Sequence, residues 1–316
     1  MGDSRKSQSA IQALSAILPA AAGASSAAAL LHDAAVAKEV SAHLRRADSG
    51  AVNDNLCAWL YDTFHSSDHD LQLVVLRFLP AVAGVYLSRA AAALNKPLAG
   101  FESVLLAVYA HVTAARNGQP VTAAIPDLAQ PSVYHDGGGA AAKTLPQKSP
   151  AAASEPQLGV ISASLEPHGT VRSTRRARIV GVGLELYYSR IAQIPLGSKI
   201  EFCHFCKIWS GQNLNIDSDL DKHDRKEGKL GGRINLPWEL LQPILRILGH
   251  CLMGPEKNEE LLEAAFKACQ CLNSRALHDL NAKAVMATAS LVKLAEIMRY
   301  GEADRSEIDT SNVMTV

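Results

Sequence analysis

The stretch LQLVVLRFLPAVAGVY, residues 71–86, decides the fold class of this chain. Its apolar residues return every three or four positions, the spacing that gathers side chains on one face of an α-helix. The window 71–88 is long enough to cross a membrane, but it contains Gln72, Arg77 and Pro80, so we interpret it as a core helix. Pro80 has no backbone N–H, and we expect it to kink this helix or to split it in two.

Helical patterns continue on both sides of this stretch. Asn53 is a plausible N-cap for one helix, and Asp68 or Asp70 starts the next, because a short polar side chain accepts hydrogen bonds from the free N–H groups of a first turn. Pro243 lies inside a later pattern and predicts a bend or a late start there. Apolar residues recur with helical spacing in the segments 27–46, 56–64, 101–109, 179–191, 200–209, 240–252, 259–272 and 280–298.

The last of these segments has the most regular spacing. Its apolar residues repeat in steps of four and three, which is typical of a helix face that packs along another helix. The residues of this expected seam are Leu280, Ala284, Ala287, Leu291, Leu294 and Met298.

A β-hairpin is predicted near residues 111–125. The runs 111–115 and 121–125 look extended, and Asn117 and Gly118 lie between them. Both residues tolerate positive φ, so Asn-Gly between two extended runs is a strong hairpin signal.

The fold class is therefore mostly α: an irregular helical bundle or solenoid-like domain with one small β-hairpin. A Gly-, Ala- and Pro-rich stretch interrupts it and is predicted to be a disordered insert, because it can bury little apolar surface. The expected organisation is a flexible N-terminus at 1–25, an N-terminal helical part at 26–135, the insert at 136–171, a C-terminal helical part of the same domain at 172–300 and a flexible tail at 301–316.

Composition excludes some classes of function. The 316 residues include 31 Lys and Arg against 31 Asp and Glu, so the chain lacks the basic excess of a protein that coats nucleic acid. The first ten residues are polar and do not resemble a signal peptide, so we expect the six cysteines to be reduced thiols in the cytosol.

The motif Cys203-His204-Phe205-Cys206 is the strongest chemical signal, and it allows two interpretations. A zinc site would need a second ligand pair, but the thiols of Cys269 and Cys271 should point to different sides of a helix. We therefore favour buried cysteines, while a thiol- or metal-dependent enzyme that uses Cys203, His204 and Cys206 stays open as an alternative. No familiar catalytic or nucleotide-binding motif occurs, so we expect no enzyme and nominate no catalytic, cofactor-binding or metal-binding residue.

A basic cluster follows the insert. Arg172, Arg175, Arg176 and Arg178 could bind anionic lipid, which would make the chain a direct membrane adaptor. We favour the simpler interpretation that they form the solvated start of a helix.

Several strings together resemble the hyccin family. They are Leu56 to Tyr61, Leu76 to Pro80, Phe101 to Tyr109, the Asn117-Gly118 turn, Pro131-Ser132-Val133-Tyr134-His135 and Gly232 to Pro237. The resemblance covers about residues 25–300, and Pro131 to His135 is its most specific part. The resemblance is to a plant-type member, and one departure from the family pattern is that the long tail common in animal members is missing, since the chain stops at Val316.

The resemblance implies a non-catalytic subunit of the plasma-membrane phosphatidylinositol 4-kinase complex of the type III alpha class. The implied partners are a helical-repeat scaffold of the tetratricopeptide type, the kinase itself and, indirectly, a lipid-anchored membrane adaptor. The implied location is the cytosol and the periphery of the plasma membrane, with no transmembrane segment, no nucleic acid and no cofactor. Pro131, Tyr134 and His135 are the candidate partner-binding residues, although Tyr134 could instead fill a gap in the core and His135 could bind a backbone carbonyl.

Overall fold

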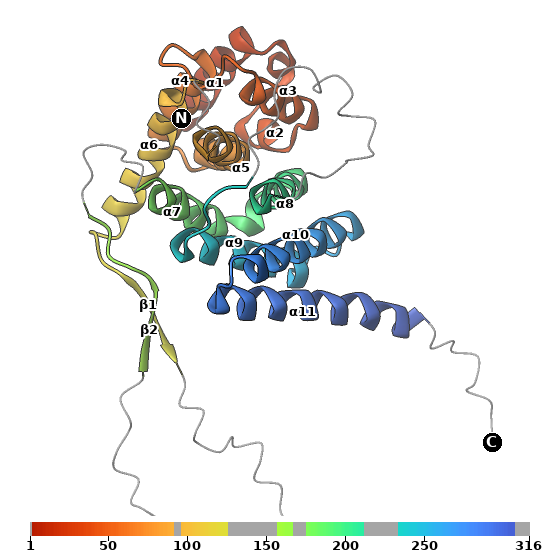
Figure 1. Ribbon diagram of the computed structural model, residues 1–316. Helices are drawn as coiled ribbons and strands as arrows, with labels where there is room; N and C mark the ends of the chain where they lie inside the picture. The colour runs from red at the N-terminus through yellow and green to blue at the C-terminus, as the bar shows by residue number, and fades with distance from the viewer. Residues whose placement is uncertain (1, 92–95, 126–156, 167–174, 212–232, 307–316) are drawn as a thin grey trace, which may run out of the picture. The chain divides into compact units, whose positions relative to one another are not determined.

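The computed structural model describes residues 2–91, 96–125, 157–166, 175–211 and 233–306 (Figure 1). The chain divides into two compact units, one formed by residues 1–110 with 170–316 and the other by residues 111–169. The described residues are mostly helical, with one two-stranded antiparallel sheet, as the sequence predicts.

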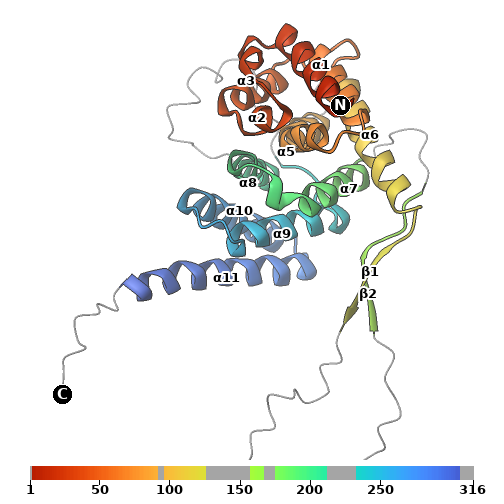
Figure 2. The same cartoon turned by 180° about the vertical axis from the view of Figure 1, so that it is seen from behind.

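The first half of the larger unit surrounds a central helix, α5 (His69–Ala91). Helices α2, α3 and α4 pack against α5, and α1 packs against α2 and α4. Figures 1 and 2 both show these helices gathered around α5. Their bounds are α1 Gly2–Ile17, η1 Pro19–Gly23, α2 Ala27–His32, α3 Ala34–Arg45, α4 Asn55–His65 and α6 Ala99–Ala115.

Most of the N-terminal segment, Gly2–Ile17 and Pro19–Gly23, is helical, whereas the sequence predicts a flexible N-terminus at 1–25. Leu14 is fully buried, and the indole N–H of Trp59 on α4 donates a hydrogen bond to the carbonyl of Ala10 at 2.8 Å. Ile11, Leu14 and Leu18 form a short apolar stripe with spacings of three and four. Ser and Ala dilute this stripe, so the sequence alone shows it only weakly.

Helix α5 runs without a break through Pro80, so the predicted split at this residue is wrong. Asp68 caps the helix as expected: its carboxylate accepts hydrogen bonds from the N–H groups of Asp70 and Leu71 at 3.0 and 3.2 Å.

Within the described part of the chain, α5 alone has the length and apolarity of a membrane span, and 94% of its most apolar window is buried by the other helices. This burial agrees with the interpretation of a core helix.

A buried arginine joins α5 to α2. The guanidinium of Arg77 donates hydrogen bonds to the carbonyls of Leu30, at 3.2 Å, and of Leu31. These carbonyls belong to the last turn of α2, where backbone acceptors have no partner within the helix. Burial lowers the pKa of Arg77 below its ordinary value, because the charged form loses its water shell.

The second half of the larger unit adds successive pairs of helices. Figures 1 and 2 show α7 and α8 next to α5, then α9 and α10, and finally α11. Gly84 permits close packing of α5 on α8, because a Cβ there would lie 2.3 Å from the ring of Phe205. The bounds are α7 Arg176–Ser189, η4 Ile191–Gln193, α8 Leu196–Ser210, α9 Trp238–Met253, α10 Glu259–His278 and α11 Ala282–Ser306.

The expected seam on the last helix is only partly present. Leu280 lies before α11, is 90% exposed and has a φ of +52°. The buried residues of α11 are instead small ones, Ala284, Thr288 and Ala295, and the Thr288 hydroxyl donates to Asn273 on α10 at 3.0 Å. Because small residues let α10 approach closely, the larger side chains of the predicted seam are left half-buried or exposed at the edge of α11.

The smaller unit contains the sheet, but its first strand differs from the prediction. Residues 111–115 are the end of α6, and β1 (Val121–Ile125) pairs antiparallel with β2 (Gln157–Ser162). Asn117 and Gly118 do adopt positive φ, at +48° and +70°. They end α6 instead of turning a hairpin: the N–H of Gly118 donates to Thr113 and that of Asn117 to Ala114.

Strand β2 also corrects part of the predicted insert 136–171, since residues 157–166 are ordered here. Arg116 holds them next to the end of α6, with its guanidinium donating to the Ser162 hydroxyl at 3.1 Å and the Ala163 carbonyl at 3.0 Å. The remainder of the insert lies outside the described residues. Helix α11 extends through Ser306, so the predicted tail at 301–316 begins as helix, and residues 307–316 are outside the described part.

Candidate functional site: the α9–α11 groove

The partner-binding residues predicted from sequence, Pro131, Tyr134 and His135, lie outside the described residues. Their role therefore stays a prediction. Arg172 of the basic cluster also lies outside them, while Arg175 and Arg176 mark the start of α7.

The basic cluster is partly engaged inside the protein. The Nε of Arg176 donates to the hydroxyl of Tyr86 at 3.1 Å, and its guanidinium lies 5.9 Å from the centre of that ring. The Tyr86 hydroxyl in turn donates to Glu102 at 3.0 Å. Arg176 thus helps to position α7 on α5, which agrees better with a structural start of a helix than with a free lipid-binding patch.

The Cys203-His204-Phe205-Cys206 motif forms part of the core of α8. Both thiols are fully buried, whereas His204 is exposed. Burial raises the pKa of Cys206, and a hydrogen bond with the Cys251 thiol together with burial raises that of Cys203, so neither thiol is an activated nucleophile. Because His204 projects away from the two thiols, the motif does not form a convergent ligand set.

The motif is surrounded by further buried cysteines from neighbouring helices. Cys251 from α9 and Cys269 from α10 approach Cys203 and Cys206, and burial raises the pKa of Cys269 to about 12. Among the described residues, no group of three or more His, Cys, Asp and Glu side chains is arranged to hold a metal ion. The thiol- or metal-dependent alternative therefore has no assembled site in this part of the chain.

An open groove of about 630 Å³ lies where α9 and α11 meet, and we call it the α9–α11 groove. Its walls include Leu245 and Met253 from α9 and Leu291 from α11, with aromatic rings at one end from Tyr188 and Trp238. Gly249 also lines the groove, next to Leu291: a Cβ at Gly249 would lie 3.8 Å from Leu291 Cδ2, an ordinary van der Waals contact. Apolar and aromatic side chains from α7, α9 and α11 thus form much of the groove.

The charged groups of the groove are basic. Arg246 lies over the ring of Tyr188 at 4.3 Å from its centre, and Lys283 lies over the ring of Trp238 at 3.8 Å. Among the residues that line the groove, Arg246 is charged, His250 and Tyr188 are titratable, and none carries a carboxylate; Lys283 lies next to the lining residue Trp238. Burial, followed by the nearby Lys199, lowers the pKa of His250, so its imidazole is neutral at pH 7. An apolar groove with fixed cations at its edge suits a ligand that combines apolar and acidic side chains.

Apolar surface continues beyond the groove. Met253 at its rim is 55% exposed. Leu294 and Met298 continue the line of Ala287 and Leu291 along α11, with spacings of three and four, and are only partly covered. Partly covered apolar residues in a continuous row mark a surface that can bind another protein.

A family comparison identifies the chain. The sequence model of the hyccin family matches residues 22–315, which is almost the full length. The chain belongs to the hyccin family. Membership agrees with the strings that carry the resemblance in the sequence, and it is consistent with a subunit of a phosphatidylinositol 4-kinase complex.

Sequence reasoning did not locate the groove of this hyccin-family chain. The apolar spacing of the last helix nevertheless indicates part of the groove, because its lining residues Ala287 and Leu291 belong to the predicted helix–helix seam. The sequence does not indicate which helix packs on that seam. The structure shows that α10 covers the small residues of α11, and that Leu291 lies at the open edge next to α9.

A charge in the groove is expected to weaken the chain modestly. Leu291→Asp should lower the free energy of unfolding by about 1–2 kcal/mol, because the carboxylate would face apolar side chains but could still reach solvent. Urea unfolding followed by circular dichroism measures this loss. Full unfolding, or a stability equal to that of wild type, would contradict the half-buried position of Leu291.

Proposed function

We propose that this chain is a non-catalytic subunit that stabilises a phosphatidylinositol 4-kinase complex of the type III alpha class. In this role it supports recruitment of the kinase to the plasma membrane and synthesis of phosphatidylinositol 4-phosphate there. Membership of the hyccin family supports this proposal, together with the α9–α11 groove as a surface on which a partner can dock.

We propose a helix of a tetratricopeptide-type scaffold subunit as the occupant of the groove. Such a helix would place apolar side chains against Leu245 and Leu291 and acidic ones near Arg246 and Lys283. A stable interface buries more than about 1,000 Å² in total, so the groove would form the centre of a larger contact that includes the partly covered row on α11.

The proposed mechanism needs no bond-making step in this chain. A subunit that binds only the folded form of its partner stabilises that partner by mass action. The scaffold would then hold the kinase, and a lipid-anchored adaptor would bring the assembly to the membrane. The location that follows is the cytosol and the periphery of the plasma membrane.

Affinity purification from a membrane-containing lysate, followed by mass spectrometry, tests the proposal. The wild-type chain is expected to recover a helical-repeat scaffold and a phosphatidylinositol 4-kinase. Met253→Glu, which adds a negative charge at the rim of the groove, is expected to lose most of both. Val52→Glu is the matched control, because Val52 is 88% exposed in the loop between α3 and α4. Recovery of neither protein by wild type would refute the proposal, and equal recovery by both variants would refute the role of the groove.

A further inference from the structure

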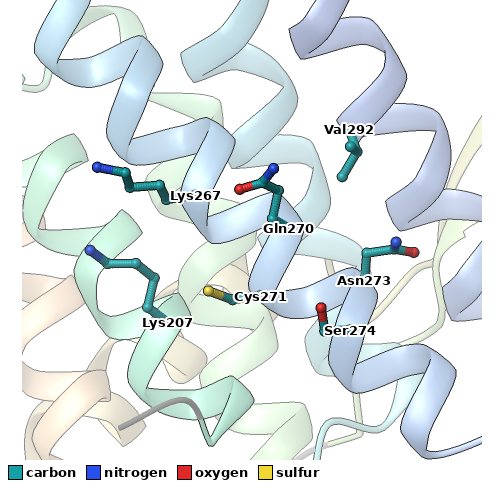
Figure 3. Close-up of a pocket in the computed structure, with 7 residues that line it drawn as sticks. All are labelled: Lys207, Lys267, Gln270, Cys271, Asn273, Ser274 and Val292. Carbon is teal, nitrogen blue, oxygen red and sulfur yellow. The ribbon is translucent and has the colours of Figure 1, made fainter. Parts of the chain in front are cut away.

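A second pocket, of about 550 Å³, lies between α8, α10 and α11 (Figure 3). Five of its seven lining residues have polar side chains: Lys207 from α8 and Lys267, Gln270, Asn273 and Ser274 from α10, with the Cys271 thiol between the two lysines. In Figure 3 the two lysine side chains extend in the same direction at one end of the pocket, and Asn273 and Ser274 lie at the other end. None of these residues lines the α9–α11 groove.

Lys207 is the unusual residue of this pocket. It is only 8% exposed, and no carboxylate in the described part of the chain lies within ion-pair distance of its ammonium. Burial lowers the pKa of Lys207, because its ammonium has lost part of its water shell, so an anion in the pocket would stabilise the charged form.

Lys199, the other buried lysine of α8, differs from Lys207 in its ion pairing. It is 3% exposed, and its ammonium lies 2.7 Å from a carboxylate oxygen of Glu256. Two lysines about two turns apart on one helix are thus both buried, yet among the described residues only Lys199 has a carboxylate within ion-pair distance. The difference points to an external anion for Lys207.

The charge around the pocket is positive overall. Glu263 is the carboxylate at its edge, and it is shared between Lys267 and Arg299, with both distances 3.2 Å. Three cations, counting Lys207, therefore face one carboxylate. Burial raises the pKa of Cys271, so the thiol is neutral at pH 7 and does not offset this excess.

We propose that this pocket binds a phosphate monoester, with its phosphate between Lys207 and Lys267. Two ammonium groups match the charge of a phosphate dianion, and lysine binds phosphate as a mobile point charge. The Asn273 carbonyl oxygen already accepts a hydrogen bond from Thr288 at 3.0 Å, which leaves its amide N–H groups to donate. The amides of Asn273 and Gln270 and the Ser274 hydroxyl would bind the polar group that carries the phosphate.

Glycerol 3-phosphate is a suitable soluble probe, and isothermal titration of the purified full-length chain measures its binding. The wild-type chain is expected to bind it saturably, and Lys207→Gln is expected to weaken binding by at least about tenfold, the effect of losing one buried charge contact. Lys38→Gln is the control, because Lys38 is exposed on α3 and lies outside both the pocket and the groove. The Lys207 variant should fold, since it removes a charge that pairs with no carboxylate in the described part of the chain. Lys267→Gln, at a more exposed position, gives a second test with a smaller expected loss.

Vesicles of phosphatidylcholine with and without phosphatidic acid distinguish the two possible sources of the phosphate monoester, a soluble ligand and a lipid headgroup. Lys207-dependent binding of glycerol 3-phosphate but not of the vesicles would assign a soluble ligand. Lys207-dependent binding to the phosphatidic acid vesicles as well would assign a lipid headgroup. No saturable binding of either probe by wild type, or equal binding by the Lys207 and Lys38 variants, would overturn the proposal. The scaffold test at the groove does not depend on this result.

Discussion

Gly181→Ala is expected to destabilise the chain by about 2–4 kcal/mol, although alanine forms helices better than glycine. Gly181 lies where α7 crosses the first turn of α9, and a Cβ there would lie 2.5 Å from the carbonyl oxygen of Glu239. This atom belongs to the backbone, so it cannot rotate away as a side chain would. The helices would have to separate, and the gain in helix propensity of about 1 kcal/mol is too small to compensate.

Gly183→Ala is the matched control in the same helix. Its nearest neighbour would be Leu79 Cδ2 at 3.6 Å, which is an ordinary van der Waals contact. This variant is expected to equal wild type or to gain up to about 1 kcal/mol from helix propensity. Urea unfolding of both variants, followed by circular dichroism, measures the difference. If Gly181→Ala proved as stable as Gly183→Ala, the packing of α7 on α9 described here would be wrong.

Arg77→Met is expected to destabilise the chain by about 2–3 kcal/mol. Methionine would fill much of the same volume, but the carbonyls of Leu30 and Leu31 would lose their donor in a buried place. Removing a buried charge is itself favourable and offsets part of the lost hydrogen-bond energy. We therefore expect the free energy of unfolding to fall by no more than about 3 kcal/mol.

Arg46→Met provides the comparison for this substitution. The side chain of Arg46 is 60% exposed and forms a surface ion pair with Asp48 at 3.2 Å, a contact worth less than about 1 kcal/mol. Denaturant unfolding gives the two stabilities, and amide hydrogen exchange should show faster opening of α2 only in the Arg77 variant. Similar losses in both variants would show that Arg77 does not anchor α2.

The sequence predicted the parts of the fold that depend on local chemistry. Apolar spacing in α5 and capping by Asp68 are properties of neighbouring residues, and the structure confirms both, whereas α4 is capped by Asp54 and not by the predicted Asn53. Pro80 was expected to interrupt α5, but burial on all sides of the helix outweighs the loss of one hydrogen bond.

The errors concern features that tertiary contacts decide. Residues 111–115 contain β-branched side chains, yet they continue α6 because Asn117 and Gly118 close the helix end. The strand that pairs with β1 lies more than thirty residues further along, inside the predicted insert, and no local pattern could reveal it. The weak stripe of α1 likewise becomes recognisable only when Trp59 is seen to pack on it.

The candidate site, too, could be predicted from the sequence only in part. Family resemblance could be read from strings such as Leu76 to Pro80, and the full-length match confirms the family. The α9–α11 groove could not be predicted, because Leu245 and Leu291 meet only through the crossing of two helices. The basic character of its edge depends on Arg246 and Lys283 folding over aromatic rings, which spacing along the chain does not indicate.

The most direct test of a docking role is a binding titration of the purified chain against the purified scaffold subunit. A saturable one-to-one complex is expected with wild type and with Val52→Glu, and a loss of at least about tenfold in affinity with Met253→Glu, whose added carboxylate would repel an acidic helix. Absence of a complex with the wild-type chain, or equal affinity of all three proteins, would contradict the docking role.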